Sequence, residues 1–133
     1  MVIDTSVAVA ILFDEPESAA FARAIEADST RLMPASAVFE ASLVVERAIG
    51  LAGASALDAF LHEMRMAIVP FTEAELAHAR LAFRTFGKGR HPASLNFGDC
   101  MVYAVSRTTG EALLFKGADF GRTDVLAHPA SAR

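Results

Sequence analysis

The sequence predicts an α/β fold with a mostly parallel sheet, and three observations lead to that prediction. A short apolar strand at Val2 and Ile3 runs directly into a carboxylate, Asp4, as a buried strand does when its last side chain points into a cleft. Strand and helix signals then alternate along the chain, and a continuous apolar run at 112–115 is the best strand after the first. With only Met1 ahead of it, the first strand can lie at the centre of the sheet, with later units on either side.

The composition fits one domain that spans residues 1–133. Of the 133 residues, 53% are hydrophobic, which is enough for a full core and leaves no room for a second domain. Sixteen acidic and twelve basic residues give a formal charge of -4. Binding to nucleic acid would therefore depend on local basic clusters and not on the overall charge.

Cysteine content and the first residues predict the compartment. Cys100 is the only cysteine, which excludes an internal disulfide and favours a reducing environment. The N-terminal residues lack the basic flank of a signal peptide, and the apolar run at 7–13 is too short to span a bilayer. We therefore expect a soluble, cytoplasmic protein with no membrane-spanning segment.

Capping and terminating residues mark the elements that follow the first strand. In the first half we expect a helix capped by Thr5 or Ser6 and reaching Phe13, a helix opened by a capping box of Asp14 and Glu17, a strand at 32–33 stopped by Pro34, a helix capped by Ser36 and ended by Gly50 and Gly53, and a helix capped by Ser55. In the second half we expect a strand at 68–69, a helix opened by a capping box of Thr72 and Glu75 and ended by Gly87, a helix capped by Asn96 and ended by Gly110, the strand at 112–115, and an edge strand at 124–126. Residues 87–92 read as a basic loop, and residues 128–133 as a frayed tail.

Helical periodicity predicts which face each of the longer helices buries. For the helix that begins near Ser36, the buried stripe is Val38, Ala41, Val45, Ala48 and Ile49, and the adjoining face carries Glu40, Leu43, Val44 and Arg47. For the helix that begins near Thr72, the stripe is Leu76, Ala79, Phe83 and Phe86.

Four acidic residues stand where an α/β fold brings side chains to one edge of the sheet. Each follows a strand or begins a helix: Asp4, Glu40, Asp99 and Asp119. Since strand ends and helix starts lie along the same edge of a parallel sheet, we expect the four carboxylates to converge. Clustered carboxylates repel one another, which favours a raised pKa or a bound cation, and an all-oxygen site suits Mg²⁺ or Mn²⁺. Such a site activates water and stabilises phosphoryl charge, so it predicts phosphodiester hydrolysis.

The alternative explanation is that each acid only caps a helix, pairs with a helix dipole or lies solvated at the surface. Glu40, one turn into its helix, fits that explanation. Asp4 fits it least, because Thr5 and Ser6 are both available to cap the helix that follows.

Four segments that carry these acids closely resemble one known family, the PIN-domain ribonucleases of VapC type, which are the toxin halves of bacterial toxin-antitoxin pairs. The segments match in order and at the family's spacing, and the resemblance covers essentially the whole chain. They are residues 1–7 (MVIDTSV), 39–42 (FEAS), 95–100 (LNFGDC) and 114–120 (LFKGADF), the last followed by Thr123 and Asp124.

This resemblance implies a three-layer α/β/α sandwich, a homodimer and a metal-dependent endoribonuclease that acts on RNA. It implies that Asp4 and Asp99 bind Mg²⁺, that Glu40 and Asp119 complete the acidic quartet, and that Asp124 is at most an auxiliary acid. It also implies a cognate antitoxin protein whose tail blocks the active site. The RNA target does not follow, since the family includes many specificities.

Other α/β proteins handle phosphate with an acid at a strand end. A phosphotransfer receiver needs an Asp after the third strand, where this chain has Val69, Pro70 and Phe71, and an aspartyl-phosphate phosphatase needs a second Asp at the position of Ser6. Both are excluded. A non-catalytic α/β module that sequesters a protein or RNA partner stays open as the alternative function.

Basic and hydroxyl side chains surround the acids in the sequence. The basic residues predicted to contact phosphate are Arg84, Lys88, Arg90, His91, Lys116 and Arg122, and Arg47 lies about two helical turns from Glu40 on the same face. Ser6 is the preferred candidate for a hydroxyl that orients a carboxylate, although plain capping explains it equally well. Cys100 reads as a packed thiol and not as a nucleophile.

Overall fold

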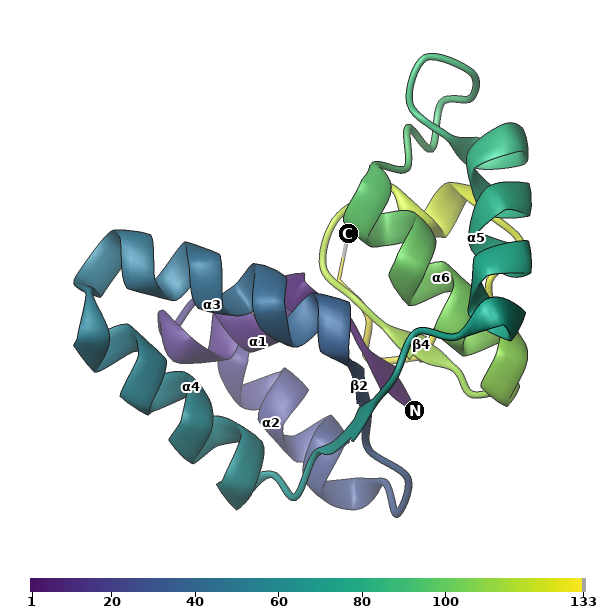
Figure 1. The fold of residues 1–133 in the computed structure, drawn as a ribbon. Helices are drawn as coiled ribbons and strands as arrows, with labels where there is room; N and C mark the ends of the chain where they lie inside the picture. The colour runs from purple at the N-terminus through teal and green to yellow at the C-terminus, as the bar shows by residue number, and fades with distance from the viewer. Residues whose placement is uncertain (133) are drawn as a thin grey trace.

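The computed structural model describes residues 1–132 and, within them, a sheet of four parallel strands in the order β3-β2-β1-β4 (Figure 1). The strands are β1 (Val2–Ile3), β2 (Leu32–Pro34), β3 (Ala67–Val69) and β4 (Leu113–Leu114). The helices are α1 (Thr5–Leu12), α2 (Ser18–Ala27), α3 (Ala35–Ile49), α4 (Leu51–Glu63), α5 (Glu73–Phe86), α6 (Phe97–Thr109) and a 3₁₀ helix, η1 (Phe120–Arg122). The predicted three-layer α/β/α architecture is confirmed. None of the helices within residues 1–132 combines the length and the apolar character that crossing a membrane requires.

β1 holds an inner position because the chain winds in both directions from it. Val2 is in register with Leu32 of β2 on one side and with Leu113 of β4 on the other. The chain first builds β2 and β3 outward from β1 and then returns to place β4 on the opposite side. The winding reverses between β1 and β4, so Asp4 stands where open α/β sheets bind ligands.

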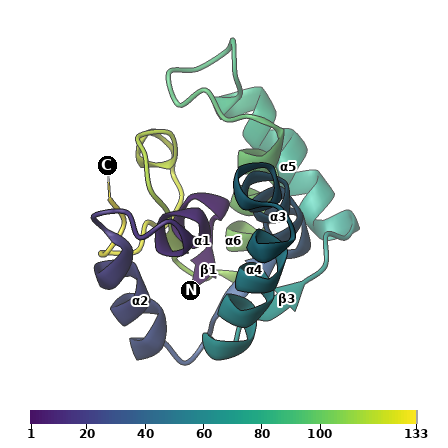
Figure 2. The same ribbon diagram turned by 90° about the vertical axis from the view of Figure 1, so that its left-hand side faces the viewer.

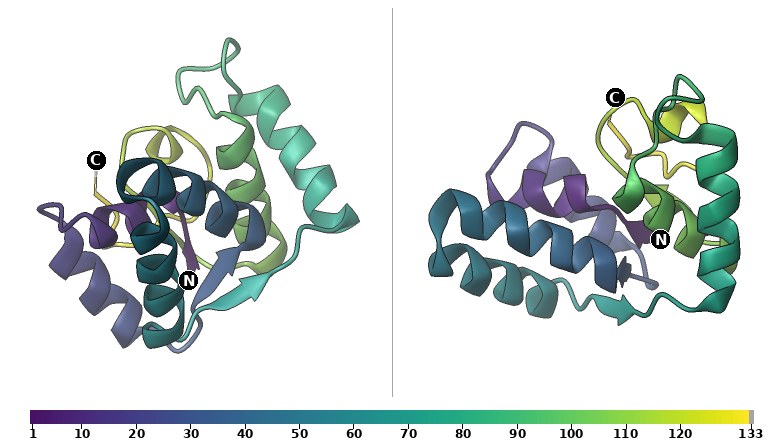
Figure 3. Two further views of the ribbon diagram at one scale, coloured as in Figure 1. Left: turned by 60° about the vertical axis from the view of Figure 1, so that its left-hand side comes forward. Right: turned by 45° about the horizontal axis from the view of Figure 1, so that its top comes forward.

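The short sheet lies between two groups of helices. Both residues of β1 and both residues of β4 are 0% exposed, and Phe21 and Ile25 of α2 are buried with them. Figure 1 and the right-hand view of Figure 3 show α1 to α4 gathered on one side of the sheet and α5 with α6 on the other. α3 packs on both α1 and α6, and Glu40 near its start meets Thr5 of α1 and Gly98 of α6, so the first turns of these helices lie in one region.

The helix caps predicted before α2 and α3 do not form. The box of Asp14 and Glu17 does not form, and α2 begins only at Ser18. The Glu17 carboxylate pairs instead with the ammonium group of Lys116, far along the chain. α3 begins at Ala35 and not after Ser36, whose hydroxyl is buried without a hydrogen-bond partner among residues 1–132.

Gly53 was expected to end a helix, and instead it lies buried inside α4. The predicted cap Ser55 also lies within α4, where it is exposed. A Cβ on Gly53 would lie 2.5 Å from the carbonyl oxygen of Val45 in α3. The residue is therefore small because α3 and α4 approach closely there. At the end of α3, Ile49 was predicted to be buried and is 52% exposed.

The second half confirms the predicted caps, but the end of the chain differs from expectation. Capping boxes open α5 and α6, and Gly110 ends α6 in the left-handed conformation with φ 74°. The expected strand at 124–126 is reduced to an isolated bridge between Leu113 and Ala127. Residues 128–132 are not frayed, because their backbone groups pair with the free edge of β4 and its extension, as in the 3.1 Å bond from Ala132 N to Phe115 O. Arg133, the last residue of the expected tail, lies outside the described residues.

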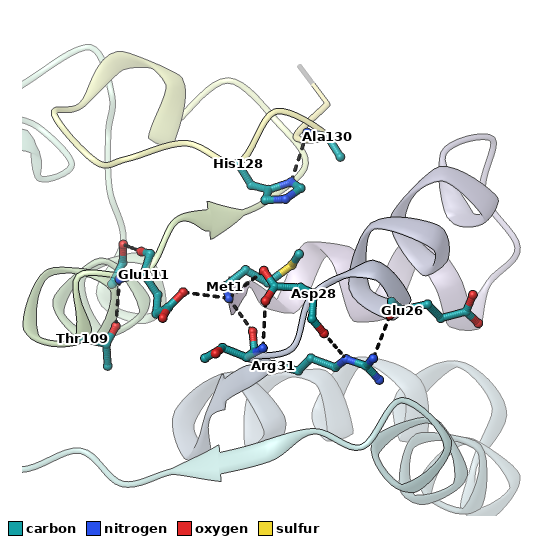
Figure 4. Close-up of polar contacts among 10 residues, drawn as sticks. Met1, Glu26, Asp28, Arg31, Thr109, Glu111, His128 and Ala130 are labelled. Atoms are coloured by element: carbon teal, nitrogen blue, oxygen red, sulfur yellow. Dashed lines mark hydrogen bonds and ion pairs between the residues drawn. The ribbon is translucent and has the colours of Figure 1, made fainter.

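The start of β1 is fixed by ion pairs on the α-amino group of Met1 (Figure 4). The amine lies 3.1 Å from Asp28 Oδ2 and 3.0 Å from Glu111 Oε2, and it also donates to the carbonyl of Thr30. These partners come from the turn before β2 and the turn before β4. One buried cation therefore ties together the starts of three neighbouring strands, β2, β1 and β4.

Asp28→Asn is expected to lower the free energy of unfolding at pH 7 by about 1 kcal/mol. The backbone N–H of Thr30, and then the amine of Met1, lower the pKa of Asp28 below its ordinary value of 3.8. A carboxyl whose pKa is lowered by folding stabilises the protein above pH 3.8 and loses that contribution as the pH falls through the folded value. Urea unfolding at several pH values measures this.

Glu26→Gln is the control, because Figure 4 shows the Glu26 side chain directed away from the amine of Met1. The difference between the Asp28→Asn variant and the parent should disappear in acid. A difference that stays constant with pH would show that the amide, and not the lost charge, is responsible.

Candidate active site

Asp4 occupies the switch point with its carboxylate almost entirely buried, at 6% exposure. It follows β1 and is the N-cap of α1, where its Oδ2 accepts the backbone N–H of Ser6 at 3.0 Å and also the Ser6 hydroxyl. The expectation that Thr5 or Ser6 caps this helix is therefore wrong. The reason is geometric, since the residue that ends the strand is also the one with extended backbone immediately before the first helical turn.

The capping bonds do not offset the burial of this charge. Burial raises the pKa of Asp4 from 3.8 to about 6, against the lowering effect of both bonds from Ser6, and the charges of Asp99 and Glu40 raise it further. Two of the other three predicted acids therefore lie within electrostatic reach of Asp4. A buried carboxylate with acidic neighbours is a group that gains from a nearby cation.

Glu40 projects from the second turn of α3 toward α1 and α6. Its Oε2 accepts the hydroxyl proton of Thr5 at 2.8 Å, and its carboxylate lies against the backbone of Gly98 at the start of α6. The bond to Thr5 shows that Glu40 is more than a partner of its own helix dipole.

Asp99 lies half-buried in the first turn of α6. Its Oδ2 accepts the backbone N–H of Asn96 at 2.8 Å, and the Asn96 side chain accepts the N–H of Asp99 at 3.0 Å, which completes the predicted cap. Burial raises the pKa of Asp99, the bond from Asn96 lowers it, and the charges of Asp119 and Glu40 raise it.

Asp119 is exposed and precedes η1, at some distance in the chain from the end of β4. Its charge acts on Asp99, and Asp119 is not among the groups that shift the pKa of Asp4. Asp124 lies elsewhere, where its Oδ1 accepts the hydroxyl of Tyr103 at 2.6 Å and its other oxygen lies 3.9 Å from Arg107. Asp124 therefore anchors the chain after η1 to α6.

The four predicted carboxylates come from different elements of the fold. Within the part of the chain that the structure describes, no three His, Cys, Asp or Glu side chains are grouped closely enough to hold one metal ion. The Glu40 carboxylate of α3 is held by Thr5 of α1, and the Asp99 carboxylate is held by Asn96 at the start of its own helix. The carboxylates of Asp4 and Asp99 supply oxygen donors of the kind that fits Mg²⁺. This ion usually keeps several waters and binds one or two carboxylates together with substrate phosphates.

Lys116 and Arg122 were expected to contact phosphate, and both are engaged within the protein. The Lys116 ammonium group lies 2.5 Å from Glu15 and 2.7 Å from Glu17, and these bonds raise its pKa. Arg122 donates to the carbonyl of Pro92 at 2.8 Å. The charge of Lys116 is therefore paired with two carboxylates before any ligand arrives, whereas Arg122 is exposed and its partner is a neutral carbonyl.

Arg84 and Arg90, two of the other predicted phosphate contacts, line a groove between α5 and α6. Leu76 and Phe83, predicted to be buried, are 47% and 43% exposed and help to line it. The sequence analysis did not predict the groove, because α5 carries apolar residues on two faces. Only the narrower face, with Ala79 and Ala82, packs against the core. The groove has a volume of about 500 Å³ and is lined by Phe71, Leu76, Ala79, Arg80, Phe83, Arg84, Arg90, Phe97, Cys100 and Met101.

The loop at residues 87–96 stands out beyond α5 and α6 (Figure 2). Its base is closed by bonds from Lys88 N to Leu95 O and from Leu95 N to Phe86 O, and Arg90 lies 5.1 Å over the ring of Phe83. Cys100 is buried beneath, where burial and then Asp99 raise the pKa of its thiol to about 11. The prediction that this cysteine is not a nucleophile agrees with that environment.

Comparison with known proteins identifies the family. The PIN domain profile matches residues 1–126. Ribonuclease VapC30 of Mycobacterium tuberculosis is 46% identical over 94% of this chain and 95% of its own length. Ribonuclease VapC of Mycolicibacterium smegmatis is 45% identical over 96% of this chain and 98% of its own. This chain belongs to the VapC family of PIN-domain proteins.

Solved structures agree with the fold of this VapC-family chain. The crystal structure of VapC20 from M. tuberculosis, described as a sarcin-ricin loop cleaving toxin, superposes with a TM-score of 0.76 at 15% identity and covers 96% of this chain and 97% of its own. VapBC2 of Rickettsia felis, solved with a DNA fragment from its promoter, gives a TM-score of 0.73 at 18% identity, with 95% and 94% covered. At these identities the likeness establishes the fold alone.

Asp4→Asn is expected to raise the free energy of unfolding of the metal-free protein by about 3 kcal/mol at pH 7. The pKa of Asp4 is raised by folding, from 3.8 to about 6, so its ionisation destabilises the folded state. In the parent, stability should fall as the pH rises from 3.8 toward 6, and this slope should be smaller in the variant. Asp58→Asn on the exposed face of α4 is the control, and unfolding in urea with EDTA is the measurement. An Asp4→Asn variant less stable than the parent would show that the carboxylate is compensated in the fold.

Proposed function

We propose that this protein is a Mg²⁺-dependent endoribonuclease, with Mn²⁺ as an alternative ion, and the toxin of a toxin-antitoxin pair. The names of its VapC relatives, at 46% and 45% identity over nearly the whole chain, support ribonuclease activity. The observation that carries the proposal is the buried carboxylate of Asp4 at the switch point, raised in pKa to about 6 and surrounded by acids. The proposed catalytic residues are Asp4, Glu40, Asp99 and Asp119.

Each proposed residue has a task that its environment supports. Asp4 and Asp99 would hold the ion, which when bound supplies an acidified water and stabilises charge on the phosphoryl group. Glu40 is fixed in direction by Thr5 and is suited to accept a proton from the attacking water. Asp119, exposed beside Asp99, is placed to act at the open side of the site.

Asp4→Asn and Asp99→Asn are each expected to reduce metal-dependent RNA cleavage by about 100- to 1,000-fold, because each removes an electrostatic partner of the transition state. Cleavage of a labelled RNA pool by purified protein, with Mg²⁺ and with EDTA, measures this. Asp58→Asn is the control. Native cleavage rates in either site variant would refute the placement of the site.

The same experiment separates the proposed enzyme from the alternative of a non-catalytic module that sequesters a partner. A binding module would retain RNA or protein binding and would show no cleavage that depends on the added ion. The aliphatic and aromatic groove between α5 and α6 alone does not distinguish them, since both functions use such surfaces.

The partners follow from the same proposal. A second groove, of about 580 Å³, is lined by Glu40, Leu43, Val44, Arg47 and Ala48, so Arg47 shares a surface with Glu40 as the helical spacing predicts. We propose that the tail of an antitoxin covers this acidic and apolar region and blocks the active site. We also propose a homodimer in the cytoplasm, where RNA is available as substrate.

RNA binding is expected to weaken with salt, and a Lys88→Glu, Arg90→Glu variant should show a smaller slope of log affinity against log salt, by about 2, if both cations contact phosphates. Binding is measured by fluorescence anisotropy in EDTA, which removes the contribution of the ion. Arg23→Glu on the exposed face of α2 serves as the charge control. An unchanged slope in the double variant would exclude the 87–96 loop as a site of phosphate contact.

A further inference from the structure

Gly98 lies directly before Asp99, and the Glu40 carboxylate of α3 rests against it. A Cβ at this position would lie 2.9 Å from Oε2 and 3.1 Å from Oε1 of Glu40. The first of these distances is shorter than real Cβ contacts allow. The space that any side chain at position 98 would need is therefore occupied by the end of Glu40.

The backbone of Gly98 gives no other reason for glycine. The residue lies inside the first turn of α6, and its φ is outside the left-handed region that marks Gly50, Gly89, Gly110 and Gly117. Alanine is ordinarily preferred over glycine in a helix by up to about 1 kcal/mol. Glycine here is unfavourable for the helix and is explained by the carboxylate that lies beside it.

Thr5 holds Glu40 from the α1 side. The Thr5 side chain is buried, and its hydroxyl lies 2.8 Å from Glu40 Oε2 and 3.3 Å from the carbonyl oxygen of Ala37. A hydroxyl has one proton, so the shorter contact, to a charged acceptor, is the stronger of the two. The Glu40 carboxylate is thus hydrogen-bonded to Thr5 on one side, and on the other side it fills the space that a side chain at position 98 would need.

From this position the charge of Glu40 acts on two other carboxylates of the site. It contributes to the raised pKa of both Asp4 and Asp99, although these residues come from different elements. A carboxylate displaced toward solvent would act on both more weakly, because water screens exposed charges.

We infer that Gly98 and Thr5 are positioning residues that together seat the Glu40 carboxylate beside Asp99, Thr5 by a hydrogen bond and Gly98 by leaving the space. The inference rests on the proposed function, because the seat serves the cleavage reaction. It predicts that a single methyl group at position 98 acts on catalysis through Glu40, which belongs to another helix.

The first test is Gly98→Ala. The obstructing atoms are the end of a flexible side chain, so the carboxylate moves and the protein folds, with a midpoint of thermal unfolding no lower than that of the parent. kcat for RNA cleavage should fall by about 10- to 100-fold with little change in KM, as expected when a catalytic group is misplaced by about 1 Å. Retention of the parent's kcat would overturn the inference.

A double-variant comparison separates positioning from a general effect on α6. In a Glu40→Ala background the carboxylate is absent, so adding Gly98→Ala should cause no further loss of kcat. A further loss as large as that in the parent background would overturn the inference. Thr5→Val, which keeps the shape of the side chain and removes the hydroxyl, should reproduce the loss, and Thr5→Ser should retain most of the activity. A Thr5→Val variant with native kcat would equally contradict it.

A crystal structure of Gly98→Ala gives a readout that does not depend on activity. The inference requires the Glu40 carboxylate to have left hydrogen-bond distance of the Thr5 hydroxyl, and a carboxylate still bonded there would overturn it. Failure of the unaltered protein to cleave RNA with Mg²⁺ or Mn²⁺ would refute the proposed function, while this crystallographic result would still decide the seat of Glu40.

Discussion

The burial of one carboxylate at the end of β1 is the constraint on which the site depends. Asp4 ends an inner strand at the point where the winding reverses, so the sheet removes it from water whatever its charge. Within the protein, Ser6 supplies its capping bonds, and these lower its pKa less than burial raises it. The same Ser6 hydroxyl accepts the backbone N–H of Lys116 at 3.0 Å, so the residue that compensates Asp4 also fixes the chain leaving β4. The hydrogen bonds of Ser6 therefore fix the backbone around Asp4 without neutralising its charge.

The residue between Asp4 and Ser6 extends the same constraint to α3. Thr5 cannot face the strand end as its neighbours do, because helical geometry turns successive side chains by about 100°. It points instead toward α3, where its hydroxyl meets Glu40. Three consecutive residues therefore connect the end of β1 to the rest of the site: Asp4 belongs to the site itself, Thr5 contacts α3, and Ser6 contacts the chain after β4. This explains how acids that are widely separated in the sequence come within electrostatic reach without forming one ligand set.

Local sequence signals predicted the fold class, the helix caps after residue 70 and the candidate acids, because the signal for each of these lies in neighbouring residues. The box of Asn96 and Asp99 formed as its spacing indicates. Long-range contacts decided the rest. Glu17 does not form its expected cap, because its carboxylate pairs with the ammonium group of Lys116. Gly53 lies inside a helix, because α3 packs closely against α4 at that position. Gly98 was likewise outside the reach of sequence reasoning, because only the fold places Glu40 against it.

The distribution of cations explains how an acidic protein with an acidic site can meet a polyanion. Carboxylates at Asp4, Glu40 and Asp99 repel phosphate, and Lys116, one of the two basic residues that flank Asp119 in the sequence, is paired with two glutamates. Positive charge that is open to a ligand lies instead on α5 and the loop after it, where Arg80, Arg84 and Arg90 border the apolar groove. Under the proposed function, a phosphate backbone held there would approach the acids past Phe97, which is 83% exposed and two residues from Asp99. The end of β1 supplies one buried acid, and attraction to phosphate would come from the basic residues of α5 and the loop after it.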